Sequence, residues 1–259
     1  MTAEAGGIAS HVDAPDTGIH VEHLPDRTVV TLDRPGTRNA IDQTMVDALH
    51  AVCERLERAP RILIIAGANG VFASGADIAE LRDRRAADAR LSINAGIFSR
   101  IAALPMPVIA ALDGYALGGG AELAYAADFR IGTPRLRIGN PETGLGIIAA
   151  AGALWRLPQL VGEPLAKEIV LAGRILTGEE ALAVHLITEL HEPDALLAAA
   201  HALADRIAAN DPLATRYTKA VLHAGPDAHP LAEQDAQAVL FESPEKERRM
   251  TAFLERRAR

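Results

Sequence analysis

Apolar residues return at helical spacing in the stretch between residues 42 and 58. The positions that repeat every three or four residues are Met45, Leu49, Val52 and Leu56. Such a stripe predicts an amphipathic helix over Asp42 to Arg58. Upstream of it, the β-prone runs Ile19 to Leu24 and Thr28 to Leu32 flank the turn dipeptide Pro25-Asp26, which is typical of a β-hairpin.

Two short, uninterrupted apolar runs come next, and each is followed by a glycine. Arg61 to Ala66 and Pro107 to Leu112 are therefore predicted as strands that are buried on both faces. A helical pattern covers Ala86 to Leu104 between them, and Gly118 to Ala127 follows as a short helix. Two further strands are predicted at Phe129 to Gly132 and Leu136 to Gly139. This alternation of strands and helices is typical of an α/β fold.

Beyond Pro141 the pattern is helical throughout. The predicted helix starts are a capping box at Thr177 to Glu180 and the pairs Asp211-Pro212 and Ser243-Pro244. The four helices expected after residue 193 have apolar faces that call for contact with the core or with another subunit. We divide the chain into a loose arm (1–17), an α/β core (18–192) and a C-terminal helical region (193–259).

Composition narrows the class of protein. The 259 residues are 49% hydrophobic but only 3% aromatic, so the core must be built from Ala, Leu, Ile and Val. A formal net charge of −8 provides no protein-wide positive field for nucleic acid. The apolar runs are shorter than the roughly 18 residues that cross a bilayer, and no secretory leader is recognisable. Cys53, the single cysteine, is expected to pack as a small apolar group, so we expect a soluble protein of the reducing cytoplasm.

Several short motifs are set aside. Gly144 to Ala149 fits the dinucleotide pattern Gly-x-Gly-x-x-Ala, but it follows Pro141 instead of the end of a strand. The glycines at 118–120 lack the Gly-Lys-Ser/Thr of a phosphate loop, and Ser74 lacks the glycine pair of a nucleophile elbow. The nine histidines show no paired ligand spacing, so we expect no metal site.

Two glycine-containing turns hold the candidate chemistry. Phe72 to Ile78 and Gly114 to Glu122 each follow a predicted strand. A helix that opens on glycines can bring its first N–H groups close to an anion, because no Cβ intervenes and its N-terminus is partially positive. Glu122 in the first turn and Glu142 beside Pro141 could supply an acid and a base. From the residues alone, a tight turn, a charge that offsets the helix dipole and an ordinary loop remain alternative interpretations.

Taken together, these motifs resemble the enoyl-CoA hydratase/isomerase (crotonase) family from about residue 19 to the C-terminus. The segments that carry the resemblance are Leu32 to Pro35, Asn39 to Ile41, Phe72 to Ile78, Pro107 to Ala111, Gly114 to Glu122 and Pro141-Glu142. The resemblance implies a spiral of strand-strand-helix repeats with a C-terminal helical layer that assembles trimers or dimers of trimers. It also implies an acyl-CoA thioester as substrate and no separate cofactor.

The family's catalytic positions are all occupied in this chain. By resemblance, the two oxyanion-hole N–H groups belong to Ala76 and Gly119, and the two catalytic glutamates are Glu122 and Glu142. The implied reaction is syn addition of water to a 2-enoyl-CoA, or the reverse dehydration, with enolate charge stabilised by the two donors. Glu122 would deprotonate the water and Glu142 would deliver a proton to C2. Isomerases of this family commonly keep one of these acids, so the presence of both favours hydration.

The remaining positions that are implied to contact substrate are Ser74, Asp77, Ile78, Ala79, Ala150, Trp155 and Arg256. Ala79 stands where many members carry a lysine near the CoA, so one phosphate contact is expected to be missing. Arg256 matches a place from which a neighbouring subunit offers a cation to the CoA phosphates. The segment at 149–157 departs from the run that hydratases typically have, and we expect Leu154 and Trp155 to alter the acyl pocket or its floor.

Two other functions stay open. An enoyl-CoA isomerase, or another enolate-stabilising reaction of an acyl-CoA, is suggested by the departure at 149–157. A non-catalytic trimeric binding protein that contacts RNA through its basic C-terminal helix is the second, although the net charge of −8 counts against it. The residues do not specify the length or type of the acyl chain.

Overall fold

The computed structural model describes Ser10–His11 and residues 17–257. The chain packs as two compact units, the first ending at Ala204 and the second beginning at Asp205, within helix α9 (Leu196–Ala208). Most of the arm expected over residues 1–17 lies outside the described residues. Ser10–His11 forms strand β1, which pairs antiparallel with β2 and so adds an edge to the main sheet.

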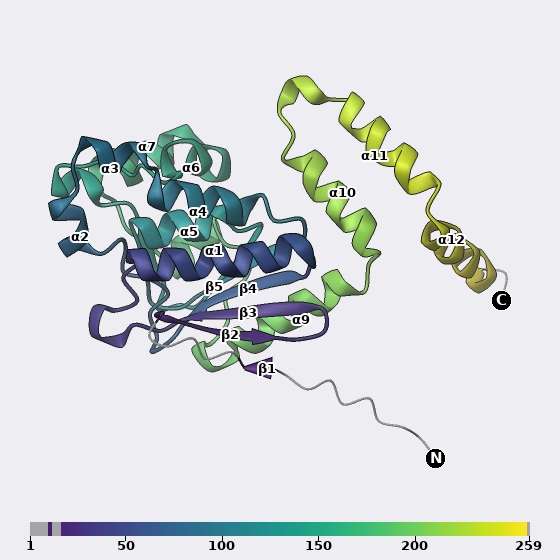
Figure 1. Cartoon of the computed structure of the whole chain (residues 1–259), viewed down its shortest axis with the longest axis horizontal. Helices are drawn as coiled ribbons and strands as arrows, with labels where there is room; N and C mark the ends of the chain where they lie inside the picture. Colours follow the sequence, from purple (N-terminus) through teal and green to yellow (C-terminus); the bar gives the residue numbers. More distant parts are fainter. Residues whose placement is uncertain (1–9, 12–16, 258–259) are drawn as a thin grey trace, which may run out of the picture. The chain divides into compact units, whose positions relative to one another are not determined.

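The main sheet of the first unit has six strands in the order β1-β2-β3-β4-β5-β7. Strands β1 to β5 are labelled in Figure 1. The predicted hairpin is confirmed, since β2 (Ile19–His23) and β3 (Arg27–Leu32) pair antiparallel. Strands β4 (Ile62–Gly67), β5 (Val108–Leu112) and β7 (Phe129–Gly132) then join in parallel. All five residues of β5 are buried, as expected for a parallel strand that is covered on both faces.

A smaller sheet has three strands in the order β6-β8-β9. They are β6 (Tyr115–Leu117), β8 (Arg137–Gly139) and β9 (Leu176–Thr177). The strand predicted at 136–139 is confirmed, and it lies in a different sheet from β7. The expectation of helix throughout after Pro141 is wrong at β9, where two residues pair antiparallel with β8. So short a strand has no periodicity of its own, and only its neighbour makes it a strand.

The first unit repeats one order of elements: a strand of the larger sheet, a strand or bridge residue of the smaller layer, and then a helix. Parallel bridges join successive repeats, Ile41 to Ala76 and Ala73 to Ala116. Helix α5 (Gly119–Ala126) directly follows β6, and the turn that holds Ala76 lies just before α2. The predicted α/β class and the strand-strand-helix repeat are therefore confirmed. The turn that holds Ala76, in one repeat, lies close to the start of α5, in the next.

Helix α1 (Gln43–Arg58) confirms the predicted amphipathic helix. It begins after Asp42, whose side chain accepts a hydrogen bond from the Met45 N–H, and its apolar stripe is buried. Cys53 packs with that stripe, and burial raises the pKa of its thiol to about 12, which fits an unreactive packing role. Helix α1 packs beside α4 (Ile93–Ala102), and α4 packs beside α5 (Figure 1).

The single helix expected over 86–104 is wrong. The structure has two helices there, α3 (Ala86–Arg90) and α4, separated by a turn at Ser92. Ser92 has a φ of 53°, a left-handed conformation that a continuous right-handed helix cannot contain. A short helix α2 (Ile78–Asp83) precedes them and begins at Asp77, whose side chain accepts from the N–H groups of the first turn. Both helices contribute to the cavity described below.

Seven α-helices follow β8 in the part of the chain described, and α8, α10 and α12 begin at the predicted start signals. In the first unit they are α6 (Ala153–Val161), α7 (Glu163–Ala172) and α8 (Gly178–Ala183), the last of which begins with the predicted Thr177 to Glu180 capping box. In the second unit they are α10 (Pro212–Leu222), α11 (Leu231–Phe241) and α12 (Pro244–Arg257). Asp211 caps α10 as predicted. Within the described stretch, no helix combines the length and apolar character needed to cross a bilayer.

Candidate active site

The turn after β4 positions the first of the two predicted anion-binding N–H groups. Ile41 and Ala76 form a parallel bridge in which the Ile41 N–H donates to Gly75 O and the Asp77 N–H donates to Ile41 O. Ala76 takes no part in either bond, so its own N–H points away from the bridge. Within residues 17–257 that N–H has no acceptor, and it is available to a ligand.

Gly119 supplies the second N–H as the first residue of α5, where a helix leaves its N–H groups without an intrahelical acceptor. Gly118 before it has φ +50°, a left-handed conformation that favours glycine. A Cβ on Gly119 would stand 3.2 Å from the Ala76 nitrogen. A Cβ on Gly120 would collide with the Ala73 carbonyl, so α5 lies directly against the neighbouring turn. The structure thus brings the two predicted donors to one spot.

Glu122 projects from the first turn of α5 and is 3% exposed. Its Oε1 accepts hydrogen bonds from the Ala151 N–H over 2.7 Å and from the Ala153 N–H over 3.1 Å. Burial and, to a lesser extent, the charge of Glu142 raise the pKa of the Glu122 carboxyl to about 7, although the two backbone donors and the charge of Arg156 act in the opposite direction. A carboxyl that titrates near neutral pH can exchange protons with water in either direction.

Glu142 begins a 3₁₀ turn, Glu142–Leu145, directly after Pro141. Its Oε1 accepts a hydrogen bond from Asn140 Nδ2 over 3.2 Å, and a Cβ on Gly118 would stand 3.2 Å from the same oxygen. Its Oε2 is buried and has no hydrogen-bond partner in the described part of the chain. Burial raises the pKa of the Glu142 carboxyl, which favours the protonated acid. The two glutamates therefore occupy different hydrogen-bond environments within one site.

A cavity of about 670 Å³ joins these groups. The residues predicted from the sequence that line it are Ser74, Ala76, Ile78, Gly119, Glu122, Glu142 and Ala150. One wall is apolar and is formed by Leu145, Ile147 and Ile148 from the turn after Glu142. The other side comes from the α2 to α4 segment, including Leu81 and the helix break at Ser92. An apolar cavity with a few converging polar groups is the usual form of a small-molecule site.

Four predicted contact residues lie elsewhere. Asp77 caps α2 and its carboxylate lies 3.6 Å from the Arg34 guanidinium, while the exposed Ala79 lies outside the cavity lining. Trp155 is 54% exposed and stacks on the Arg156 guanidinium, so neither it nor Leu154 forms the acyl pocket wall expected of them within this chain. Arg256 lies on α12 in the second unit, and its contact with CoA phosphates stays a prediction.

The structure also reveals site residues that the sequence reasoning missed. Ala151 and Ala153 supply the N–H groups that hold Glu122. Asn94 lines the cavity near Gly119, and its Oδ1 is buried without a partner in the described segment. Arg84 and Arg85 also line it, which places two cations at the cavity. A polar residue inside the otherwise apolar stretch of α4 was the available signal for Asn94.

The raised pKa of Glu122 predicts a pH-dependent cost to stability. The folded state keeps the Glu122 proton up to about pH 7, whereas the unfolded state keeps it only up to about pH 4.5. The stability that this proton contributes to the folded state is therefore fully present below pH 4.5 and is lost as the pH rises through 7. The Glu122→Gln variant, which is never charged, should therefore gain stability over the wild type by roughly 3 kcal/mol between pH 4.5 and 8. Denaturant unfolding at both pH values measures this; an equal difference at both would contradict it.

Comparisons with known proteins identify the family of this chain. The sequence profile of the enoyl-CoA hydratase/isomerase family matches residues 28–259. A crotonyl-CoA hydratase of Syntrophomonas wolfei is 36% identical over 240 residues, which cover 88% of this chain and 92% of the relative. A short-chain-enoyl-CoA hydratase of Clostridium acetobutylicum is 34% identical over 238 residues, with coverage of 88% and 91%.

The fold comparison leads to the same family. The crystal structure of an enoyl-CoA hydratase from Bacillus anthracis superposes with a TM-score of 0.87 at 30% sequence identity, covering 92% of this chain and 96% of that one. The predicted crotonase-like fold is thereby confirmed. With a family profile that spans most of its length and relatives that match nearly end to end, the chain belongs to the enoyl-CoA hydratase/isomerase family.

Proposed function

We propose that this protein is an enoyl-CoA hydratase, which adds water syn across C2=C3 of a 2-enoyl-CoA thioester or catalyses the reverse dehydration. The observation that carries the proposal is that two buried carboxyls, Glu122 and Glu142, share one cavity with the N–H groups of Ala76 and Gly119. Hydration needs a base for water, an acid for C2 and donors for the enolate oxygen. These four groups meet that requirement.

The reaction follows from the positions of these groups. Glu122 removes a proton from water as the oxygen attacks C3, and the C=C electron pair moves toward the thioester. The resulting enolate oxygen accepts from the two backbone N–H groups, each of which contributes about 2.7 to 4 kcal/mol if it acts like measured oxyanion donors. Glu142 then gives its proton to C2. Glu122 is left protonated and Glu142 charged, and exchange with solvent restores both.

The cavity and its residues also bear on the acyl group, on the need for a cofactor and on the location of the protein. The apolar wall of Leu145, Ile147 and Ile148 supports a short hydrocarbon acyl group, in line with the names of the two hydratase relatives. The acid, base and electrostatic groups come from the chain itself, so we propose that no metal or cofactor is needed beyond the CoA thioester. The single, buried Cys53 supports a location in the reducing cytoplasm.

Incubation of the protein with crotonyl-CoA tests the proposal. We expect the absorbance of the conjugated enoyl thioester to fall and 3-hydroxybutyryl-CoA to form, with the same rate in the presence of a metal chelator. A 3-enoyl-CoA substrate that is converted to the 2-enoyl form, without hydration, would instead identify an isomerase. Binding of the thioester without any turnover would identify a non-catalytic protein.

We further propose that the chain assembles as a trimer or a dimer of trimers through its C-terminal helices. Large apolar side chains are exposed on the second unit, among them Phe241 on α11 and Phe253 and Leu254 on α12. Apolar faces of this kind are typical of obligate subunit interfaces. Analytical ultracentrifugation of the full chain should give a trimer or hexamer, and the chain truncated at Asp211 should lose that assembly. A stable full-length monomer would contradict this proposal.

A further inference from the structure

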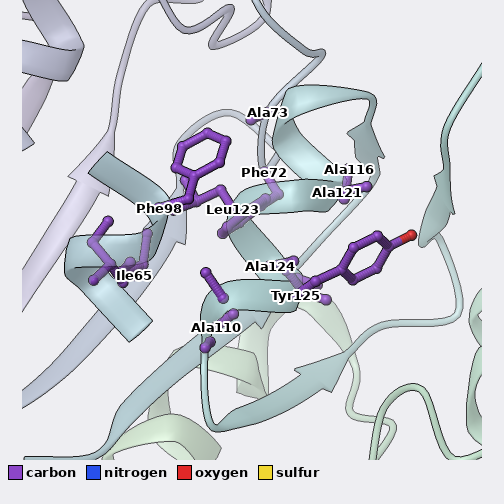
Figure 2. Close-up of a cluster of buried hydrophobic side chains, with 14 of the residues drawn as sticks. Ile65, Phe72, Ala73, Phe98, Ala110, Ala116, Ala121, Leu123, Ala124 and Tyr125 are labelled. Atoms are coloured by element: carbon purple, nitrogen blue, oxygen red, sulfur yellow. The ribbon is translucent and has the colours of Figure 1, made fainter. Parts of the chain in front are cut away.

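Three buried polar side chains, Tyr125, Asn140 and Glu142, are joined in a line by hydrogen bonds, and the proposed reaction uses only Glu142. The Tyr125 hydroxyl donates to Asn140 Oδ1 over 3.0 Å, and Asn140 Nδ2 donates to Glu142 Oε1 over 3.2 Å. Figure 2 shows the Tyr125 hydroxyl pointing away from the apolar cluster that includes Leu123 and Ala124. The tyrosine ring thus packs in the core while its hydroxyl reaches Asn140.

The surroundings of Asn140 leave its amide one favourable orientation. Its Nδ2 lies 3.4 Å from the Gly118 carbonyl oxygen, which can only accept a hydrogen bond, and 3.2 Å from Glu142 Oε1. Rotating the amide by half a turn would place Oδ1 against these two oxygens and would remove the acceptor of the Tyr125 hydroxyl. All three neighbours therefore favour the orientation in which Nδ2 faces Glu142.

This orientation distinguishes the two oxygens of Glu142. Oε1 already accepts from Asn140 Nδ2, so a proton placed on Oε1 would compete with that N–H for the same oxygen. Oε2 is buried and meets no donor among the described residues. We infer that Asn140, held by Tyr125 and Gly118, is a positioning residue that confines the proton of Glu142 to Oε2, the oxygen that delivers it to the substrate. The inference deepens the proposed hydratase function and rests on it.

The other groups that act on this line are few in the part of the chain described. Glu122 on α5 is the carboxyl that interacts electrostatically with Glu142, and the Arg156 guanidinium on α6 acts on Glu122. Arg130, buried beside Tyr125, stabilises negative charge on that side of the line. None of them donates a hydrogen bond to Glu142. The backbone N–H of Glu142 itself also lowers the pKa of its carboxyl, but Asn140 is the side chain that does so through a hydrogen bond, and a substitution can remove it.

The first test measures the protonation of Glu142 without turnover. In a Glu122→Gln background, carbon NMR of the Glu142 carboxyl should show its pKa about one unit higher in Asn140→Leu, because the donor that favours the ionised form is gone. Asn140→Asp keeps nearly the same size and safeguards the fold; it should raise that pKa as well. Tyr125→Phe keeps the packed ring and should give a smaller rise. Tyr115→Phe, at an exposed tyrosine of β6, is the matched control and should give none.

The second test measures catalysis with Glu122 intact. We expect kcat for hydration to fall about tenfold in Asn140→Asp and less in Tyr125→Phe, with KM within about threefold of the wild type. The alkaline limb of the kcat profile, where the acid is lost, should move to higher pH by the same shift that NMR records. A role in folding alone would lower the amount of active protein and leave the position of that limb unchanged.

The outcomes separate the inference from the proposed function. An active wild type whose Glu142 pKa and alkaline limb are unchanged in all the Asn140 and Tyr125 variants would overturn the inference alone. A wild type without hydratase activity would overturn the proposed function, and with it the delivery of the proton to substrate. In that case a shifted Glu142 pKa in the variants would still support the placement of the proton by Asn140.

Discussion

Replacement of Glu122 by glutamine is expected to lower kcat for crotonyl-CoA hydration by about 10² to 10⁴, with folding and thioester binding retained. Glutamine keeps the oxygen that accepts from the Ala151 and Ala153 N–H groups, but it cannot take a proton from water. Glu142→Gln should show a loss of similar size, because an amide cannot deliver the proton to C2. Steady-state kinetics with crotonyl-CoA, together with equilibrium binding of a saturated acyl-CoA, measures both variants.

The control for these variants is Glu168→Gln, which makes the same change on the exposed side of α7, outside the cavity lining. It should retain wild-type turnover. Wild-type turnover in either cavity variant would rule out the two-carboxylate mechanism. If loss of Glu142 abolished hydration while loss of Glu122 left it unchanged, Glu142 alone would carry the acid-base chemistry and the assignment of Glu122 as base would be wrong.

A side chain at Gly119 is expected to block the site for the enolate oxygen. Its Cβ would stand 3.2 Å from the Ala76 nitrogen, so the γ-methyls of Gly119→Val would occupy the space between the two donors. Loss of a single oxyanion donor reduces kcat by about 10² to 10³, and Gly119→Val should lower kcat/KM at least that far. Gly119→Ala, with one methyl group, should give an intermediate value in the same crotonyl-CoA assay.

A matched control exists on α4. Gly96 is also a helical glycine, and a Cβ built on it meets no neighbour within 4 Å. Gly96→Val should therefore keep near wild-type kinetics, and circular dichroism should show the same fold for both valine variants. Normal kinetics in Gly119→Val would mean that the thioester oxygen binds elsewhere and that the paired N–H groups of Ala76 and Gly119 serve only the fold.

Local patterns in the sequence determined most of the elements. The stripe of α1 and its Asp42 cap, the β2–β3 hairpin and the Thr177 capping box depend on residues within a few positions of one another. The same holds for the buried strands β4 and β5, whose apolar runs match the burial of parallel strands. The glycine turns and the two glutamates could also be singled out, because helix N-termini and glycine conformations are local properties.

What the local patterns left undecided were contacts between distant segments. The break at Ser92 and the strand at β9 arise from packing and pairing with neighbours, which helical periodicity does not report. The exposure of Trp155 was missed for the same reason, since an apolar residue type does not specify which face of α6 is covered. Spacing along the chain therefore predicted the helices and strands better than it predicted which segments pack or pair with them.

The chemistry of the site was decided by the tertiary structure. Glu122 is held by N–H groups 29 and 31 residues further along the chain, and burial of that group is the main cause of its raised pKa. The line from Tyr125 through Asn140 to Glu142 likewise joins α5 to the turn after β8. The sequence identifies the donors and the acids. Their hydrogen bonds and their solvation depend on which groups folding places around them, and this environment determines the pH at which each acid loses its proton.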